Sequence, residues 1–193
     1  MIYPATNKSI KLAINSLQNG EIIVYPTDTL YGFGVDATNT EAIKKLNQLK
    51  GRAQSLSVII DDIQNIFNFS NITQNVYQHV KHILPGKYTV LLKSKNSCLS
   101  PLISNSSPLV GIRIPNHQFS LKLAKEFGKP IVTTSVNRHG EESMNDVNEI
   151  MRSFPKINIF EERKLLDSNG STIIDMTQCP FKIIRQGDGE YPK

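Results

Sequence analysis

The sequence predicts a mixed α/β fold in a single domain that spans residues 1–193. Segments with helical spacing of apolar residues alternate with short β-branched runs, and two such runs lie close together near the C-terminus. This order is typical of a mixed sheet covered by helices. With 193 residues, 39% of them hydrophobic and 20% charged, the chain is long enough to bury a continuous core and too apolar to stay disordered.

In the first quarter of the chain, two predicted helices enclose one strand. Apolar residues with i, i+3, i+4, i+7 spacing predict a helix over residues 10–17, stopped by Asn-Gly. The run EIIVYP (21–26) predicts a buried strand, and the turn-rich PTDTLYG follows its proline. Thr38 and Glu41 have capping-box spacing, which predicts a second helix that runs to Gly51.

The rest of the chain continues the alternation. The patterns predict strands at 56–60, 88–93, 109–115, 130–135, 171–176 and 181–187, and helices at 76–83 and 120–128. Four loops at the ends of these elements are unusually polar: PTDTLYG, LKGR, TTSVNRHG and NGSTI. We expect the chemistry of the protein to lie in these loops.

The net charge of +5 indicates attraction to phosphate, which fits a nucleotide, an RNA backbone or a merely soluble basic protein. Four cations stand apart, at the edges of apolar runs: Lys50, Arg52, Arg113 and Arg185. Such side chains can converge on a cleft, so their placement favours a small anionic ligand over a basic tail.

No apolar run is long enough to cross a bilayer, and the N-terminus does not have the pattern of a secretion signal. We therefore expect a cytoplasmic protein with no membrane partner. Cys98 and Cys179 lack the spacing of a zinc, redox or disulfide site, and we expect both thiols to be buried or inert.

Each polar loop, taken alone, also has an ordinary structural explanation. In LKGR, Lys50 and Arg52 could clamp a phosphate or carboxylate, or simply offset the dipole of an exposed helix end. If they form a clamp, replacing either with alanine should abolish activity at little cost in stability, whereas unfolding of either variant would favour the structural explanation. In TTSVN, Ser135 and Asn137 lie on the same side of an extended chain, where they could bind a ligand or stabilise their own loop. His139 is expected to be a solvated loop residue.

The order and spacing of the motifs are more specific than any one of them. The succession PTDTLYG, LKGR, LPGKYTVLL, GIRIP, SVNRHG, STIID and IIRQG resembles the threonylcarbamoyl-adenylate synthases, or YrdC-like family, over nearly the whole chain. The family's Lys-x-Arg and Ser-x-Asn signatures correspond here to Lys50-Gly51-Arg52 and Ser135-Val136-Asn137.

This resemblance implies a twisted mixed sheet flanked by helices around a central, basic, concave cavity. It implies that threonine is bound by Thr29, Lys50, Arg113, Ser135 and Ser171, and ATP by Arg52, Asn137, Asn145 and Arg185. The two signature pairs, Lys50 with Arg52 and Ser135 with Asn137, would carry the catalysis.

The implied reaction converts L-threonine, bicarbonate or CO2, and ATP into threonylcarbamoyl-adenylate and pyrophosphate. Partner proteins would then transfer the threonylcarbamoyl group to an adenosine of tRNA. Magnesium would arrive on the ATP phosphates, because the sequence has no clustered carboxylates to hold it, so no protein metal site is expected.

The chain departs from the family pattern in two places. The segment AQSLSV is about two residues shorter than usual and lacks both prolines, so the usual polar contact to ATP would either be absent or be replaced by Gln54 or Ser55. In addition, Ser-Val-Asn replaces Ser-Ala-Asn, which adds volume near the pocket.

Two other functions remain open. One is a module of the same fold that binds double-stranded RNA or tRNA, although the sequence has no tryptophan and no stacking motif. The other is a paralogue that makes a different carbamoyl-adenylate, like the corresponding domain of hydrogenase maturation proteins, which sits in a much larger chain with zinc-finger cysteines.

Overall fold

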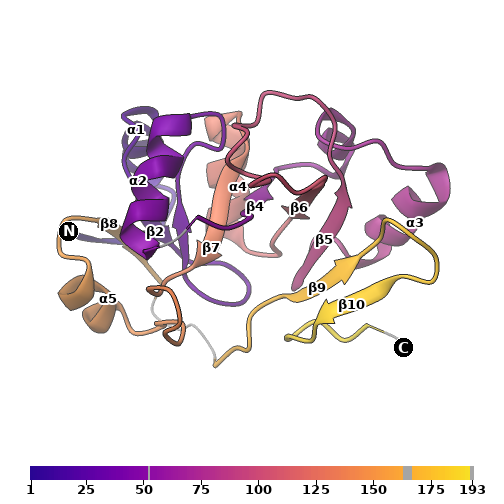
Figure 1. The fold of residues 1–193 in the computed structure, drawn as a ribbon. Coiled ribbons are helices and arrows are strands. Elements are labelled where there is room, and N and C mark those ends of the chain that lie inside the picture. Colours follow the sequence, from indigo (N-terminus) through magenta and orange to yellow (C-terminus); the bar gives the residue numbers. More distant parts are fainter. Residues whose placement is uncertain (52, 163–166, 192–193) are drawn as a thin grey trace.

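The computed structural model describes residues 1–51, 53–162 and 167–191. Within these residues, ten strands form one mixed sheet in the order β1-β8-β2-β3-β7-β4-β6-β5-β9-β10 (Figure 1). The strands are β1 (Ile2–Pro4), β2 (Ile23–Tyr25), β3 (Gly32–Gly34), β4 (Ser57–Ile59), β5 (Tyr88–Lys93), β6 (Leu109–Arg113), β7 (Ile131–Ser135), β8 (Asn158–Glu161), β9 (Thr172–Asp175) and β10 (Lys182–Arg185). The mixed α/β class predicted from the sequence is confirmed.

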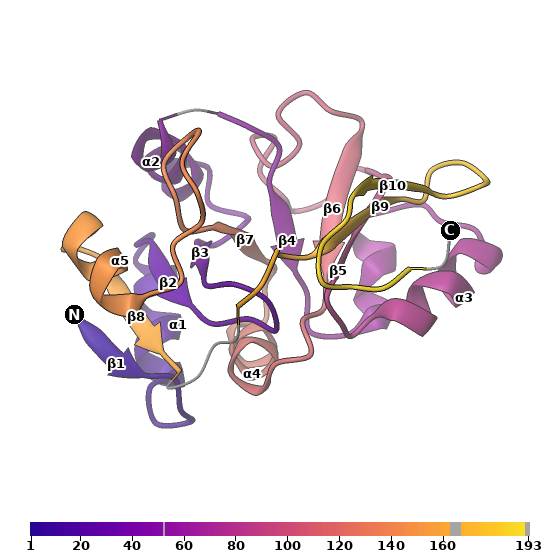
Figure 2. The same cartoon turned by 90° about the horizontal axis from the view of Figure 1, so that it is seen from below.

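The α-helices are α1 (Ile10–Gln18), α2 (Thr40–Lys50), α3 (Gln74–Ile83), α4 (Gln118–Phe127) and α5 (Val147–Ser153), and a 3-10 helix spans Ile63–Asn68. Helices α1 and α4 lie on one side of β2, β3, β7 and β4, and α2 lies on the other (Figure 2). Consecutive side chains of β2 divide between the two sides. Ile23 and Tyr25 join the core under α1 and α4, while Val24 joins the larger core that includes Leu46 of α2. The sheet is therefore buried on both faces at this point.

The helices and strands predicted from apolar patterns are present, with ends shifted by a few residues. The strand β3 lies inside a stretch that reads as a turn, because glycine has a low preference for strands. Its position is decided by its neighbours: it pairs with β2 and β7, and a Cβ on Gly34 would lie 2.6 Å from a ring carbon of Tyr25. The elements β1, α5 and β8 were also not predicted from the sequence patterns.

Two details correct the sequence analysis. The cap of α2 is Asn39, whose Oδ1 accepts a hydrogen bond from the Ala42 amide at 3.1 Å, whereas the Thr38 hydroxyl donates to Asp36. Cys98 and Cys179 are exposed and not buried, because they lie in the loops after β5 and β9, while the inertness of their thiols stays a prediction.

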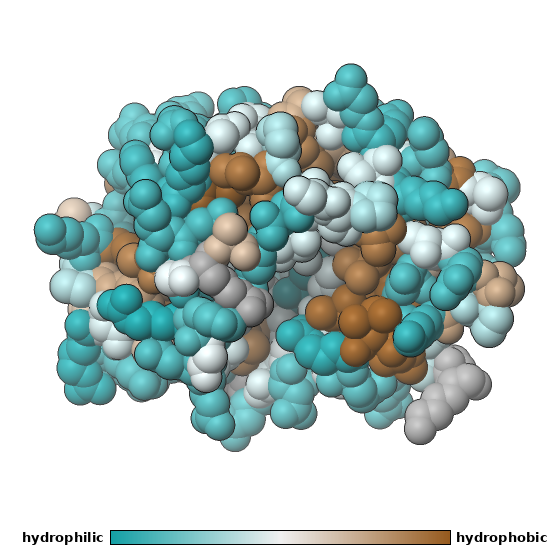
Figure 3. Space-filling view, viewed as in Figure 1, coloured by the Kyte–Doolittle hydropathy of each residue, from teal (hydrophilic) through white to brown (hydrophobic). Residues whose placement is uncertain are grey.

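Hydrophilic residues cover most of the face drawn in Figure 3, and an apolar group lies over β9 and β10, where Ile184 is 50% exposed. Among the described residues, none of the helices has the length and apolar character needed to span a membrane.

Candidate functional site

A polar cavity of about 520 Å³ lies where the loops that follow several strands meet. Its size is typical of a pocket for a small ligand. Seven of the residues predicted for the site line it: Thr29, Lys50, Arg113, Ser135, Asn137, Ser171 and Arg185. The folding of the chain thus brings together three of the four cations singled out from the sequence. The fourth, Arg52, lies outside the described residues.

Lys50 reaches the cavity from the last turn of α2, where Gly51 takes up the left-handed conformation with φ +77° and ends the helix. Its ammonium donates to the carbonyl of Ser135 at 2.7 Å and to the carbonyl and Oδ1 of Asn137 at 3.1 and 2.7 Å. The Ser135 hydroxyl donates to the same Oδ1 at 2.8 Å. The two signature motifs therefore form one connected group of polar atoms.

The expectation that Lys50 is an exposed cation at a helix end is wrong. The residue is only 3% exposed, and its ammonium lies 5.5 Å from the centre of the Phe33 ring. The helix brings it under the end of β7, where carbonyl oxygens replace water as its partners. Sequence spacing gave the position of Lys50 but not its burial, since β7 is 85 residues away along the chain.

Arg113, at the end of β6, is buried beneath the cavity at 7% exposure. One guanidinium nitrogen donates to Asp28 Oδ1 at 2.9 Å and to Thr29 Oγ1 at 3.1 Å. Its Nε is fully enclosed and has no hydrogen-bond partner among the residues that the structure describes. Burial lowers the pKa of Arg113, and the carboxylate of Asp28 opposes that shift. A buried guanidinium that borders a cavity is suited to an anionic ligand.

Ser171 and Arg185 form the opposite wall. The Ser171 hydroxyl lies 2.8 Å from that of Thr89 on β5, and the Arg185 guanidinium donates to the Ser171 carbonyl at 2.8 and 3.3 Å. Burial lowers the pKa of Arg185, and the positive charge of Arg113 lowers it further. The positive charges of Arg113 and Arg185, which both line the cavity, together create an electrostatic potential that favours anions.

The remaining residues discussed from the sequence divide between the cavity lining and its surroundings. Asn145 does not line the cavity; its Oδ1 accepts a hydrogen bond from the backbone amide of Tyr31, which does. Gln54 and Ser55, from the shortened segment, line the cavity. His139 is exposed and also lines it, and its backbone amide donates to the Lys50 carbonyl.

Several lining residues were not named individually as site residues. Tyr31, Thr133, Thr134 and Asn169 belong to the polar segments predicted to hold the chemistry, whereas Ser57, Thr89 and Ser143 lie outside them. Thr89 had a usable signal, because it is the polar residue at the start of an otherwise apolar run, YTVLLK. The pairing of Asp28 with Arg113 had none, since these residues are 85 positions apart.

No group of three or more His, Cys, Asp or Glu side chains that could hold a metal ion occurs in the described part of the chain. The cavity offers cations and hydroxyl groups instead, which do not form a cage for Mg²⁺.

The fold and the cavity together define an α/β protein with one mixed sheet and a polar cavity whose lining cations are suited to a small anionic ligand. Residues 15–187 match the Sua5/YciO/YrdC family model, which is described as "Telomere recombination". The chain belongs to this family.

Curated relatives of this chain include proteins named threonylcarbamoyl-AMP synthase. The chain is 31% identical to a threonylcarbamoyl-AMP synthase of Wigglesworthia glossinidia brevipalpis over 186 residues, which cover 93% of this chain and 94% of the relative. It is 29% identical to the Bos taurus threonylcarbamoyl-AMP synthase over 190 residues, with 93% and 68% covered.

A solved structure supports the fold directly. The crystal structure of P. abyssi Sua5 complexed with L-threonine superposes with a TM-score of 0.86 at 25% identity, and the match covers 97% of this chain. It covers 56% of the Sua5 chain, so the present chain spans little more than half the length of that protein.

Proposed function

We propose that the chain is an L-threonylcarbamoyladenylate synthase, a nucleotidyltransferase that forms threonylcarbamoyl-AMP and pyrophosphate from L-threonine, bicarbonate or CO2, and ATP. The observation that carries the proposal is the buried Arg113 guanidinium, which lines the cavity beside Thr29. A ligand carboxylate in the cavity would pair with this cation, and the named relatives with this fold are threonylcarbamoyl-AMP synthases.

In this proposal, the amino acid lies against the Arg113 side of the cavity. Arg113 binds the threonine carboxylate, and the hydroxyl groups of Thr29, Ser135 and Ser171 provide neutral donors and acceptors around it. Lys50 contributes positive charge near Ser135, from which it is 2.7 Å away. The complex of P. abyssi Sua5 with L-threonine supports this class of ligand.

ATP would occupy the side of Arg185 and Asn137. Arg185 offers a fork of donors to phosphate oxygens, and Asn137 offers its amide. Arg52 and Asn145 are proposed to extend this contact, with Gln54 or Ser55 beside the triphosphate in place of the family's longer loop.

The chemistry requires no covalent enzyme intermediate. The amine of threonine captures CO2 with loss of a proton, or bicarbonate with loss of water, and forms a carbamate. A carbamate oxygen then attacks the α-phosphorus, and the bond to pyrophosphate breaks. Negative charge stays on oxygen throughout, so fixed cations and donors such as Lys50, Arg52, Ser135 and Asn137 are the useful catalytic groups. Mg²⁺ would enter on the ATP phosphates.

The product would pass to proteins that transfer threonylcarbamoyl to tRNA, and the expected compartment is the cytoplasm. Direct binding of tRNA or double-stranded RNA is the alternative activity, because the net charge of +5 attracts phosphate.

The test is release of pyrophosphate from ATP that depends on threonine, measured beside calorimetric binding of threonine. Arg113→Lys keeps the charge but loses the fork, so we expect the KM for threonine to rise by about tenfold or more. Arg152→Lys, on the exposed side of α5, is the matched control and should leave the KM unchanged.

The same assay separates the alternatives. Turnover that does not need threonine, or that accepts carbamoyl phosphate instead, would indicate a different carbamoyl-adenylate as product. Tight, salt-sensitive RNA binding without any release of pyrophosphate would indicate an RNA-binding module.

A further inference from the structure

One wall of the cavity is not part of the regular sheet. Asn169, Gly170 and Ser171 line the cavity just before β9 begins at Thr172. Ladder hydrogen bonds of the sheet therefore do not set the position of this segment, and other contacts hold it in place.

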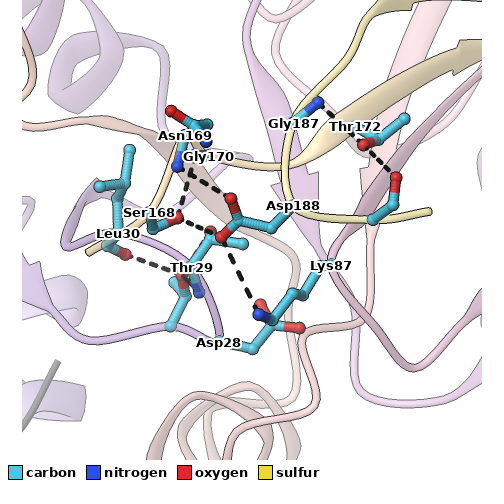
Figure 4. A network of polar contacts seen from close by, with 12 residues as sticks. Asp28, Thr29, Leu30, Lys87, Ser168, Asn169, Gly170, Thr172, Gly187 and Asp188 are labelled. Atoms are coloured by element: carbon cyan, nitrogen blue, oxygen red, sulfur yellow. Dashed lines mark hydrogen bonds and ion pairs between the residues drawn. The ribbon is translucent and has the colours of Figure 1, made fainter. Parts of the chain in front are cut away.

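These contacts come from the turn that follows β10 (Figure 4). The carboxylate of Asp188 accepts hydrogen bonds from the Asn169 amide at 2.9 Å and the Ser168 hydroxyl at 2.5 Å. The amide of Asp188 donates to the Gly170 carbonyl at 2.9 Å. The Ser168 oxygen in turn accepts from the Gly170 amide at 3.0 Å, so one carboxylate organises the whole turn.

A second set of hydrogen bonds, made by the Thr172 hydroxyl, joins the same two segments. The Thr172 hydroxyl accepts from the Gly187 amide at 2.9 Å and donates to the Gly189 carbonyl at 2.6 Å. The backbones approach so closely that a Cβ on Gly187 would overlap with the Gly170 carbonyl. Gly170 itself has φ +80°, a conformation that favours glycine.

Asp188 is not a cavity-lining residue. Its side chain is 13% exposed, and the nearest cation is Lys87, whose Nζ lies 3.9 Å from Oδ2. Any effect of Asp188 on a ligand must therefore pass through the segment that it holds. That segment presents Ser171 to the cavity, and the Ser171 carbonyl holds the Arg185 guanidinium.

We propose that Asp188 is a positioning residue, which fixes the Ser168–Ser171 turn and thereby sets the places of both Ser171 and Arg185 in the cavity. The inference rests on the proposed function, in which Ser171 faces threonine and Arg185 faces ATP. One carboxylate outside the cavity would then control the affinity for both substrates.

The experiment compares Asp188→Ala with Asp188→Asn, and uses Asp175→Ala as the matched control. Asp175 also accepts bonds from a backbone amide and a hydroxyl, those of Thr177, but it lies at the other end of β9, away from the cavity. For each variant, KM and kcat come from pyrophosphate release, and the Kd values for threonine and a non-hydrolysable ATP analogue from calorimetry.

For Asp188→Ala we expect KM and Kd for both ligands to rise on the order of tenfold, with kcat changed by less than about threefold. Asp188→Asn keeps an acceptor for the Asn169 amide and a partner for Ser168, so it should restore values to within about threefold of wild type. Asp175→Ala should lower the Tm without moving either Kd.

Unchanged Kd values in Asp188→Ala would overturn the proposal, and so would Asp188→Asn being as impaired as Asp188→Ala. If Asp188→Ala does not fold, Ser168→Ala decides, since it removes one bond of the same turn: higher Kd values support the proposal and unchanged values overturn it. Failure of the proposed function would instead appear in the wild-type protein, as absence of threonine-dependent pyrophosphate release.

Discussion

At the scale of single residues, burial changes the expected role of Lys50. Its ammonium makes hydrogen bonds to three oxygen atoms of Ser135 and Asn137 while it lines the cavity. A side chain in this position stabilises the end of β7 and, in the proposed function, also supplies charge to a ligand. The pattern LKGR indicates only the second of these roles.

We therefore expect Lys50→Ala to lose activity and also to lower the free energy of unfolding by about 2–3 kcal/mol, because buried acceptors lose a charged donor. Denaturant unfolding measures this change. Lys44→Ala is the control on the same helix, since its ammonium forms an exposed pair with Glu41 and should contribute far less. Equal unfolding midpoints for wild type and Lys50→Ala would contradict the burial argument.

Arg113 illustrates what a residue-level pattern can and cannot predict. GIRIP places an arginine at the end of a predicted strand, and the resemblance to the family assigns it to threonine. The partner Asp28 and the place of Arg113 in the cavity wall emerge only when β6 lies beside the loop after β2. The suitability of Arg113 for an anionic ligand depends on both.

At the scale of elements, α2 is the helix that delivers Lys50 to the cavity, and its start was predicted one residue early. Thr38 and Glu41 have the right spacing for a capping box, but the Thr38 amide and hydroxyl both donate to Asp36 Oδ1. Asn39 is then left to cap the helix. Asp36, which takes both donors of Thr38, is itself held in place by an ion pair: its Oδ2 lies 2.9 Å from Nζ of Lys129.

Replacing this cap should have a measurable cost. Asn39→Ala is expected to reduce the free energy of unfolding by about 1 kcal/mol, because the Ala42 amide loses its acceptor. Asn39→Asp retains the acceptor and should be close to wild type in the same denaturant titration. A capping box at Thr38 would predict the opposite result, with Asn39→Ala neutral.

At the scale of the whole molecule, the cavity exists because the sheet brings together loops from both halves of the chain. Lys50 and Ser135 come from the ends of α2 and β7. Thr89 and Arg185 come from β5 and β10, and Ser171 directly precedes β9. The lining groups are cations, hydroxyls and amides, and the described residues contain no cluster of metal ligands.

Because the described residues contain no cluster of metal ligands, the effect of removing metal ions can be predicted. EDTA should abolish the release of pyrophosphate, because ATP would lose its Mg²⁺, yet leave the Tm of the ligand-free protein unchanged. Excess Mg²⁺ should restore turnover. A fall in the Tm when EDTA is added without ATP would show that the chain itself holds a metal ion.

Local patterns in the sequence determined the α/β class, most helices and strands, and the loops in which the lining residues lie, because helical and strand periodicity act over a few neighbouring residues. Tertiary structure alone decided that the glycine-rich segment after Tyr31 forms a central strand, that Lys50 is buried, and that the turn at Asp188 supports a cavity wall. These outcomes depend on pairing and desolvation between segments tens of residues apart, and no local pattern in the sequence encodes that free energy.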